Sequence, residues 1–119
     1  MRWLIADIGG TNTRCAIARP GGTVERLETF RNREFPGLDR LLASYLGTLP
    51  PGQRPDEAVI AIAAPIRGDE IHMVNINWEF SISALARTLA LKRVTPLNDF
   101  AALAYALPVL GPEDLRQVG

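Results

Sequence analysis

Several absences in this 119-residue sequence exclude particular classes of protein. Cys15 is the single cysteine, so an intramolecular disulfide is excluded and nothing indicates an oxidising compartment. His72 is the single histidine and has no Cys or carboxylate cluster at metal-ligand spacing, so no zinc site is predicted. Thirteen basic residues balance thirteen acidic ones, which argues against a nucleic-acid surface or a polybasic membrane anchor. We expect His72 to be structural or solvated and Cys15 to pack.

Long apolar runs are also absent. No segment approaches the ~18 apolar residues of a membrane span. The charge at Asp7 comes too early for a secretory signal. Apolar residues make up 47% of the chain and charged residues 22%, an ordinary globular mixture rather than a disordered one. The composition therefore predicts one cytoplasmic domain, or a piece of one, with a hydrophobic core.

Three strands are predicted in the first thirty residues. Residues 3–6 are apolar without alternation, as in a strand that is covered on both faces. Gly9 and Gly10 follow as a turn, which we attribute to the freedom of glycine to adopt positive φ. Residues 13–18 and 24–30 complete an antiparallel meander, because a second glycine-rich turn separates them.

Helices and strands alternate after the meander. Pro36 is a favourable first helical residue, and apolar residues follow it at helical spacing as far as Tyr45. A buried strand is predicted over residues 58–64, and a short strand or hairpin arm over residues 71–74. Ser81 can cap a second helix, since its hydroxyl can accept a free backbone N–H.

The last part of the chain adds a strand over residues 93–97, a third helix from Asn98 or Asp99, and the start of another helix near Glu113. A meander followed by alternating helices and strands predicts an α/β fold, with a mixed sheet and helices on both of its faces. No helix separates the first two strands, so the glycine turn differs from a Rossmann turn or a P-loop, and neither motif occurs.

The first candidate site is the glycine turn with the polar residues around it. Successive N–H groups of such a turn can form a concave anion site, to which Thr11 and Asn12 add side-chain donors. Asp7 could hold a hydrated Mg²⁺ beside phosphate oxygens. The alternative is a tight hairpin with polar tips. A carboxylate that ends a buried apolar strand is costly without a partner, and Asp7 therefore favours a ligand.

Two further candidates follow later strands. Asn98 and Asp99 lie where a strand ends and a helix begins, a place where ligands collect in α/β sheets. Asp99 could accept a proton from a substrate hydroxyl, although both residue types are also the best helix N-caps. Residues 64–69 and 75–78 could line a pocket for a polyol with Trp78 over one side; the alternative is a hairpin turn with Trp78 in the core.

Together these segments resemble the bacterial glucokinase family of the hexokinase and actin-like ATPase superfamily. Four stretches carry the resemblance, in the family's order: LIADIGGTNTR at 4–14, AIAAPIRGD at 61–69, NWEFS at 77–81 and LNDFAA at 97–102. One stretch alone would be weak evidence, but four in order on a compatible β/α pattern are specific. The resemblance implies a ribonuclease-H-like small domain of a two-lobed sugar kinase over residues 1–110. Residues 111–119 would begin the connection to a larger C-terminal domain.

The resemblance also implies an activity and its residues. It implies ATP-dependent phosphorylation of glucose to glucose 6-phosphate, with ATP and Mg²⁺. Asp99 looks like the catalytic base for the sugar's 6-hydroxyl, and Asn98 looks like a hexose ligand. The family's first phosphate-binding loop corresponds here to Asp7, Gly9, Gly10, Thr11 and Asn12. Asp7 would also face the metal ion.

The family's second phosphate loop and adenosine pocket are not recognisable here, so we expect these residues alone to fold without turning over substrate. The expected partners are a sugar and a nucleotide, with no nucleic acid or membrane. The oligomeric state stays open: family analogues are often dimers, but much of that interface could lie in the second lobe. A non-catalytic sugar-sensing or regulatory module on the same fold is the alternative, and an actin-type assembly protein is a third interpretation. The kinase interpretation requires Asp99 and the bend after Asp7 to face a common crevice from adjoining strand ends.

Overall fold

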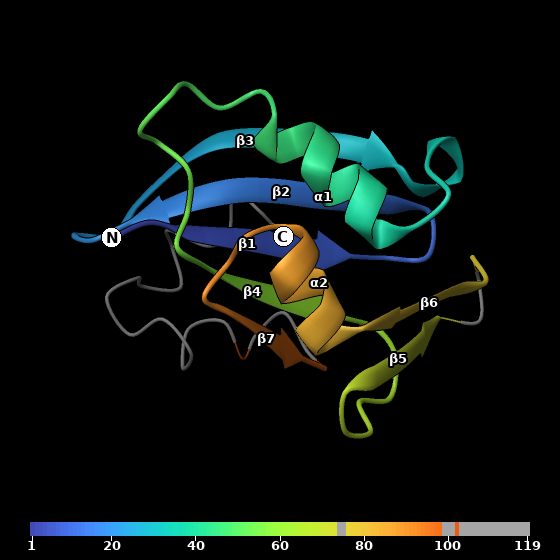
Figure 1. Ribbon diagram of the computed structural model, residues 1–119. Coiled ribbons are helices and arrows are strands. Elements are labelled where there is room, and N and C mark those ends of the chain that lie inside the picture. The colour runs from blue at the N-terminus through green and yellow to red at the C-terminus, as the bar shows by residue number, and fades with distance from the viewer. Residues whose placement is uncertain (74–75, 99–101, 103–119) are drawn as a thin grey trace.

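The computed structural model describes residues 1–73, 76–98 and 102 (Figure 1). These described residues form a five-stranded sheet, a separate two-stranded sheet and two α-helices. The elements, in chain order, are β1 Trp3–Ile8, β2 Asn12–Arg19, β3 Thr23–Arg31, the 3-10 turn η1 Asn32–Glu34, α1 Leu38–Leu46, β4 Glu57–Ile62, β5 Glu70–Met73, β6 Trp78–Ser81, α2 Ile82–Thr88 and β7 Arg93–Leu97.

The large sheet has the strand order β3-β2-β1-β4-β7. β1, β2 and β3 pair antiparallel, which confirms the predicted meander. β1 pairs parallel with β4, and β4 pairs parallel with β7, so the sheet is mixed as expected. The predicted α/β class is therefore confirmed. The carboxyl ends of the three parallel strands meet at one edge of the sheet.

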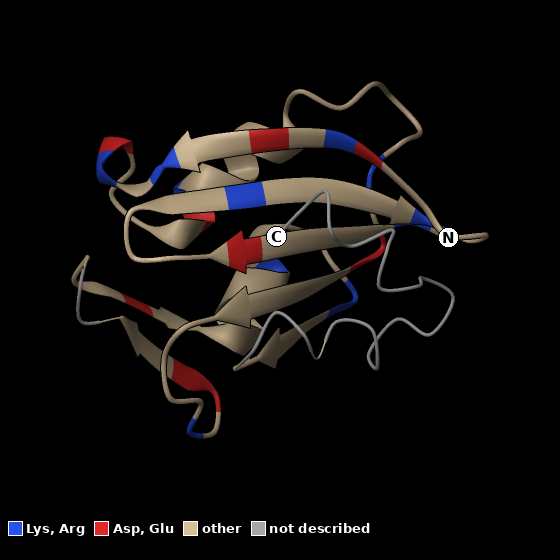
Figure 2. Cartoon of the chain, turned by 180° about the vertical axis from the view of Figure 1, so that it is seen from behind, with Lys and Arg blue, Asp and Glu red and all other residues tan. Residues whose placement is uncertain are grey.

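Both described helices lie on the same face of this sheet (Figure 1). The main core fills the space between them and the sheet, and includes Leu4, Tyr45 and Ile60, all fully buried. Ile5 is also fully buried, on the opposite face, which Figure 2 shows from behind. Burial on both faces explains why β1 is apolar without alternation. The third helix, expected from Asn98 or Asp99, lies outside the described residues.

Several elements differ from their predicted bounds, among them α1, β4 and β6. α1 begins at Leu38 with Gly37 as its N-cap, so Pro36 precedes the helix instead of opening it. β4 ends at Ile62, two residues before the predicted end. The sequence did not predict β6, which pairs with β5 and places Trp78 opposite Met73. The predicted cap at Ser81 is confirmed, since its hydroxyl accepts the N–H of Ala84 at 3.1 Å.

A bulge in β3 fixes how the end of that strand meets its neighbours. The pairing passes from Ile17 with Glu25 to Cys15 with Glu28, so β3 contains one residue more than β2 over this interval. Arg26 lies in the bulge with φ of 58°, and its carbonyl accepts a hydrogen bond from the Tyr45 hydroxyl of α1 at 2.7 Å. The bulge therefore joins the helix layer to the strand that leads into η1.

Among the described residues, no helix is long and apolar enough to cross a membrane.

Candidate functional site

The glycine turn predicted from the sequence joins β1 to β2. Its Gly9 N–H donates to the Asn12 carbonyl at 2.9 Å. A side chain at Gly9 would place a Cβ 3.2 Å from that same carbonyl oxygen, closer than most Cβ contacts. The glycines with positive φ are at other turns, such as Gly21 and Gly22. The turn itself is confirmed, but Gly9 is needed for close backbone approach and not for the positive φ that we expected.

Asn32, the first residue of η1, holds this turn. Its Nδ2 donates to the Gly9 carbonyl at 2.8 Å, and its backbone N–H donates to the Thr11 carbonyl at 2.9 Å. Its Oδ1 accepts the Thr13 hydroxyl at 2.7 Å. Asn32 and Thr13 are the buried polar residues of the described chain, and these bonds satisfy both side chains.

The carbonyls of the turn accept hydrogen bonds, and its backbone N–H groups differ from them in this respect. Within the described ranges, no acceptor is found for the backbone N–H of Gly10 or of Thr11. Gly10 is partly exposed, and Thr11 and Asn12 are exposed at the tip. Consecutive free N–H groups in a tight turn can bind an anion, so the geometry suits the predicted phosphate loop.

Asp7 lies just before this turn. Alternation along β1 places it on the same face as Ile5, opposite the helices, where it is half-buried. Burial raises the pKa of the Asp7 carboxyl, and the opposing Arg14 guanidinium on β2 offsets part of that shift. Such a carboxylate gains from a nearby cation.

The side chains here fit one kind of metal site. In the described part of the chain, no three metal-ligating side chains come together, so a cage of protein ligands is not formed there. Mg²⁺ commonly uses one or two carboxylates and completes its shell with waters and phosphate oxygens. Asp7 beside an anion-binding turn matches that pattern.

The register of the parallel strands shows how far the end of β7, which leads into Asn98, lies from Asp7 and the glycine turn. Asp7 is in register with Ala61 of β4, and Ala61 is in register with Leu97 of β7. The sequence predicted adjoining strand ends, and this was wrong: β4 lies between them, so Asp7 and Leu97 are two strand spacings, about 10 Å, apart. Asn98 follows directly and is exposed at the same edge. Asp99 lies outside the described residues, and its role stays a prediction.

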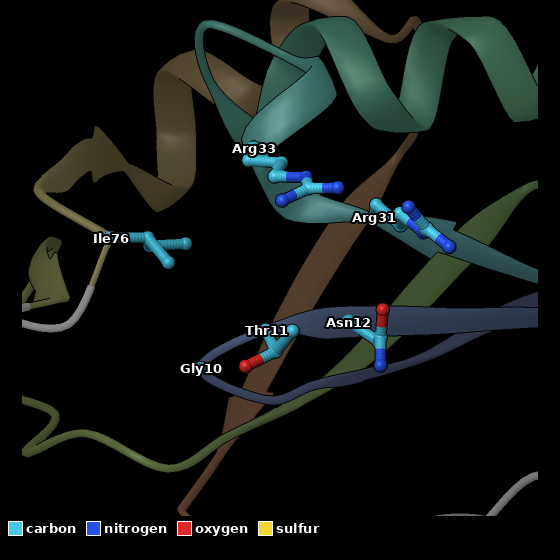
Figure 3. A pocket seen from close by; sticks show the side chains of 6 residues that line it. All are labelled: Gly10, Thr11, Asn12, Arg31, Arg33 and Ile76. Atoms are coloured by element: carbon cyan, nitrogen blue, oxygen red, sulfur yellow. The ribbon is translucent and has the colours of Figure 1, made fainter.

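A pocket of about 480 Å³ opens beside the glycine turn (Figure 3). Its residues come from three segments of the chain: Gly10, Thr11, Asn12, Arg31, Arg33 and Ile76. In Figure 3 the two arginine side chains lie across the pocket from the turn. Neither arginine nor Asn32 was predicted from the sequence, because no spacing rule links them to a turn about twenty residues earlier.

The third candidate segment is divided between the two interpretations, because Ile76 lines the pocket beside the glycine turn, whereas Trp78 and Asp69 have structural roles. Trp78 is 5% exposed and belongs to the main core, which confirms the alternative interpretation of core packing. Asp69 accepts the N–H of Ser83 at 2.9 Å and the hydroxyls of Ser83 and Ser81. These hydrogen bonds, that of Ser81 first, lower the pKa of Asp69. Asp69 therefore anchors the start of α2 to the start of β5. Asn75 lies outside the described residues.

The two residues set aside in the sequence analysis take the expected places. His72 is exposed, with its Nδ1 3.2 Å from the Glu79 carboxylate on the neighbouring strand. Cys15 is fully buried in the main core, and burial raises the pKa of its thiol. The predicted packing role of Cys15 is confirmed.

Comparison with known proteins agrees with the resemblance. The family model described as Glucokinase matches residues 4–119. Glucokinases from Photorhabdus laumondii and Ralstonia nicotianae are 43% and 40% identical to this chain over 98% of its length. The chain spans only 36% and 35% of those relatives.

Solved structures show the same fold. The glucokinase from an Antarctic psychrotroph superposes with a TM-score of 0.81 at 35% identity, covering 94% of this chain and 36% of that one. A ROK family glucokinase from Streptomyces griseus, solved with glucose and AMPPNP, has a TM-score of 0.70 at 16% identity, covering 95% of this chain and 38% of that one. With a family model matched along nearly its whole length, this chain belongs to the glucokinase family.

Proposed function

We propose that residues 1–110 are the small lobe of an ATP-dependent glucokinase, which converts glucose to glucose 6-phosphate in the cytoplasm. The observation that carries this proposal is the bonding of the glycine turn. Asn32 occupies the carbonyls of Gly9 and Thr11, and the N–H groups of Gly10 and Thr11, which have no acceptor in the described part of the chain, could bind an anion. A turn arranged in this way suits the terminal phosphates of ATP.

Asp7 is the residue that would face a hydrated Mg²⁺ held between the phosphate oxygens. When bound, the ion would neutralise charge that develops on those oxygens. Asp7 is half-buried, and burial raises its pKa, so a cation beside it would relieve an existing electrostatic cost. The turn, Thr11 and Asn12 would hold the phosphates from the other side.

Asn98 and Asp99 would serve the sugar. The exposed Asn98 follows β7 and could bind hexose hydroxyls as both donor and acceptor. Asp99 would orient the 6-hydroxyl and accept its proton as the new oxygen–phosphorus bond forms. The transition state of phosphoryl transfer is loose, so orientation and charge neutralisation provide most of the catalysis, and Asp99 needs no shifted pKa.

The relatives are longer than this chain, so the remaining parts of the site would come from a second lobe. We propose that residues 111–119 begin the connection to it. The nucleotide base and further sugar contacts would lie there, and a homodimer would form as in family analogues. Accordingly, the 119 residues alone should not phosphorylate glucose in a coupled assay. Turnover by them would contradict the assignment of the remaining parts of the site to a second lobe.

The catalytic assignment is tested in a chimera. The 119 residues replace the matching 36% of the Photorhabdus laumondii glucokinase, and glucose phosphorylation is measured. Asp99→Asn should abolish turnover while glucose binding persists, because the amide keeps the shape but cannot accept the proton. Asp39→Asn on α1, which covers the face of the sheet opposite to that of Asp7, is the matched control and should stay active.

Turnover by Asp99→Asn at the level of the control would remove Asp99 from the mechanism. Glucose binding by the chimera without any phosphorylation would favour the sugar-sensing alternative over the kinase.

A further inference from the structure

We propose that Arg31 and Arg33, with the glycine turn, form a binding site for a phosphate dianion, either free or as the phosphate of a sugar phosphate. The inference rests on the proposed function only in sharing the turn, and it adds two ligands that the phosphate loop alone does not include. The site is the pocket of about 480 Å³ shown in Figure 3.

The charge of the pocket is the first argument. The lining residues include two guanidinium groups and no acid. Among the described residues, neither Arg31 nor Arg33 has a carboxylate within 4.0 Å, whereas Arg19 and Arg93 each do. Two cations placed side by side repel one another, and a bound dianion would relieve that repulsion. The planar fork of guanidinium N–H groups matches phosphate oxygens.

The second argument is that the pocket is held open in one arrangement. Asn32 stands between the two arginines in the chain, and its buried side chain is bonded to Gly9 and Thr13. Its backbone N–H is bonded to Thr11. Because Asn32 points inward and its two neighbours are exposed, the arginine-bearing segment is held against the turn. Little ordering of the backbone would be required on binding.

The third argument is the shape and lining. The volume falls within the range of about 300–1,000 Å³ that is usual for small-molecule sites. Thr11 and Asn12 add polar side chains to the lining, and Ile76 contributes an apolar surface. A phosphate alone would leave room in this space, so a phosphate attached to a hydroxylated body of sugar size also fits.

The site would bear on regulation, because Thr11 and Asn12 belong both to this pocket and to the proposed phosphate loop. A phosphate ester held by the arginines would occupy part of the surface that the phosphates of ATP require. We therefore expect the sugar phosphate that the reaction produces to bind here and to slow the reaction.

Binding is measured by NMR titration of the ¹⁵N-labelled 119-residue chain at constant ionic strength. The probes are inorganic phosphate, glucose 6-phosphate and, as an uncharged comparison, glucose. Both phosphate probes should cause saturable shifts at the amides of Gly10, Thr11 and Asn12. Tighter binding of glucose 6-phosphate would identify a sugar phosphate site, and equal affinities would identify a site for the phosphate group alone. Shifts caused by glucose alone, or no saturation with either phosphate, would overturn the proposal.

Substitutions test the two arginines. Arg31→Ala and Arg33→Ala should each weaken phosphate binding roughly tenfold, the usual effect of losing a charge-assisted hydrogen bond. Arg31→Lys and Arg33→Lys keep the charge and remove the fork, and should weaken binding less. Arg40→Ala removes an exposed arginine of α1 outside the pocket and is the matched control.

Equal affinity in the Arg31→Ala, Arg33→Ala and Arg40→Ala proteins would show that no specific site exists. If an alanine variant does not fold, the lysine variants decide: unchanged affinity in both would overturn the guanidinium role. This outcome is separable from the kinase proposal, because Asp99→Asn in the chimera leaves the arginines intact.

Discussion

Asn32 donates a side-chain hydrogen bond of 2.8 Å to the carbonyl of Gly9, which lies 23 residues earlier in the chain. Through it, η1, which directly follows β3, holds the turn between β1 and β2 in a shape in which, among the described residues, the N–H groups of Gly10 and Thr11 have no acceptor. The proposed phosphate loop is therefore not an independent turn. Its geometry depends on the strand beside it.

Replacement of Asn32 by Ala should destabilise the chain and loosen the turn together. The buried Thr13 hydroxyl and the partly buried Gly9 carbonyl would lose their partners, at a cost of about 1–3 kcal/mol for an unsatisfied buried group. Urea unfolding of the 119-residue chain measures the change. Asn12→Ala, at an exposed asparagine of the same turn, is the control and should stay within about 0.5 kcal/mol. Equal stability of the two variants would show that Asn32 does not hold the turn.

The sequence predicted the elements whose signals are local. The helical spacing that ends at Tyr45, the cap at Ser81 and the unbroken apolar run of β1 each depend on neighbours within a few residues, and each is confirmed. The turn at Gly9 was also found, although close approach explains it better than positive φ.

The contacts across the site were not predictable in the same way. Asn12 pairs with Arg31 only because the bulge in β3 shifts the register by one residue. A shift of one residue exchanges the two faces of a strand, so the bulge decides which of residues 31 to 33 points inward. The pattern of polar and apolar residues in β3 does not indicate the bulge, because that strand is mostly exposed. Asp99, the residue on which the catalytic assignment depends, lies outside the described residues.

Asp7 should make the stability of the chain depend on pH. Its pKa is raised in the folded state, chiefly by burial, so between its ordinary value of 3.8 and the raised one the folded chain binds more protons than the unfolded chain. The contribution of Asp7 to the free energy of unfolding therefore falls as pH rises through that interval. Asp7→Asn should remove this decline, and unfolding of both proteins followed from pH 3 to pH 7 should show it.

The same variant separates stability from function. At neutral pH the Asp7→Asn chain should be at least as stable as the parent, whereas Mg²⁺-dependent ATP binding in the chimera should weaken. Glu70→Gln, at an exposed carboxyl of β5, is the control. If the free energy of unfolding declines equally with rising pH in the Asp7→Asn chain and in the parent, burial of Asp7 is not the cause of the decline.

Asp69 should show the opposite dependence. Hydrogen bonds from Ser81 and Ser83 lower its pKa in the folded state, so its stabilising contribution is present above the ordinary value of 3.8 and is lost as pH falls through the lowered one. The melting temperature of Asp69→Asn should therefore lie below that of the parent at neutral pH, and the difference should shrink in acid. Thermal melts at several pH values measure it, and a constant difference would contradict the role of the carboxylate.

Arg26 tests whether the bulge itself is set by backbone conformation. With φ of 58°, it occupies a region that glycine enters freely and that a β-branched residue strongly resists. Arg26→Gly should leave stability unchanged or raise it by up to about 1 kcal/mol, whereas Arg26→Val should lower it. The hydrogen bond from Tyr45 reaches the backbone carbonyl, so neither side-chain change removes it. If valine is tolerated as well as glycine in urea unfolding, the positive φ at this position is not required. The register of the arginine pocket would then depend on the Tyr45 contact rather than on the backbone of the bulge.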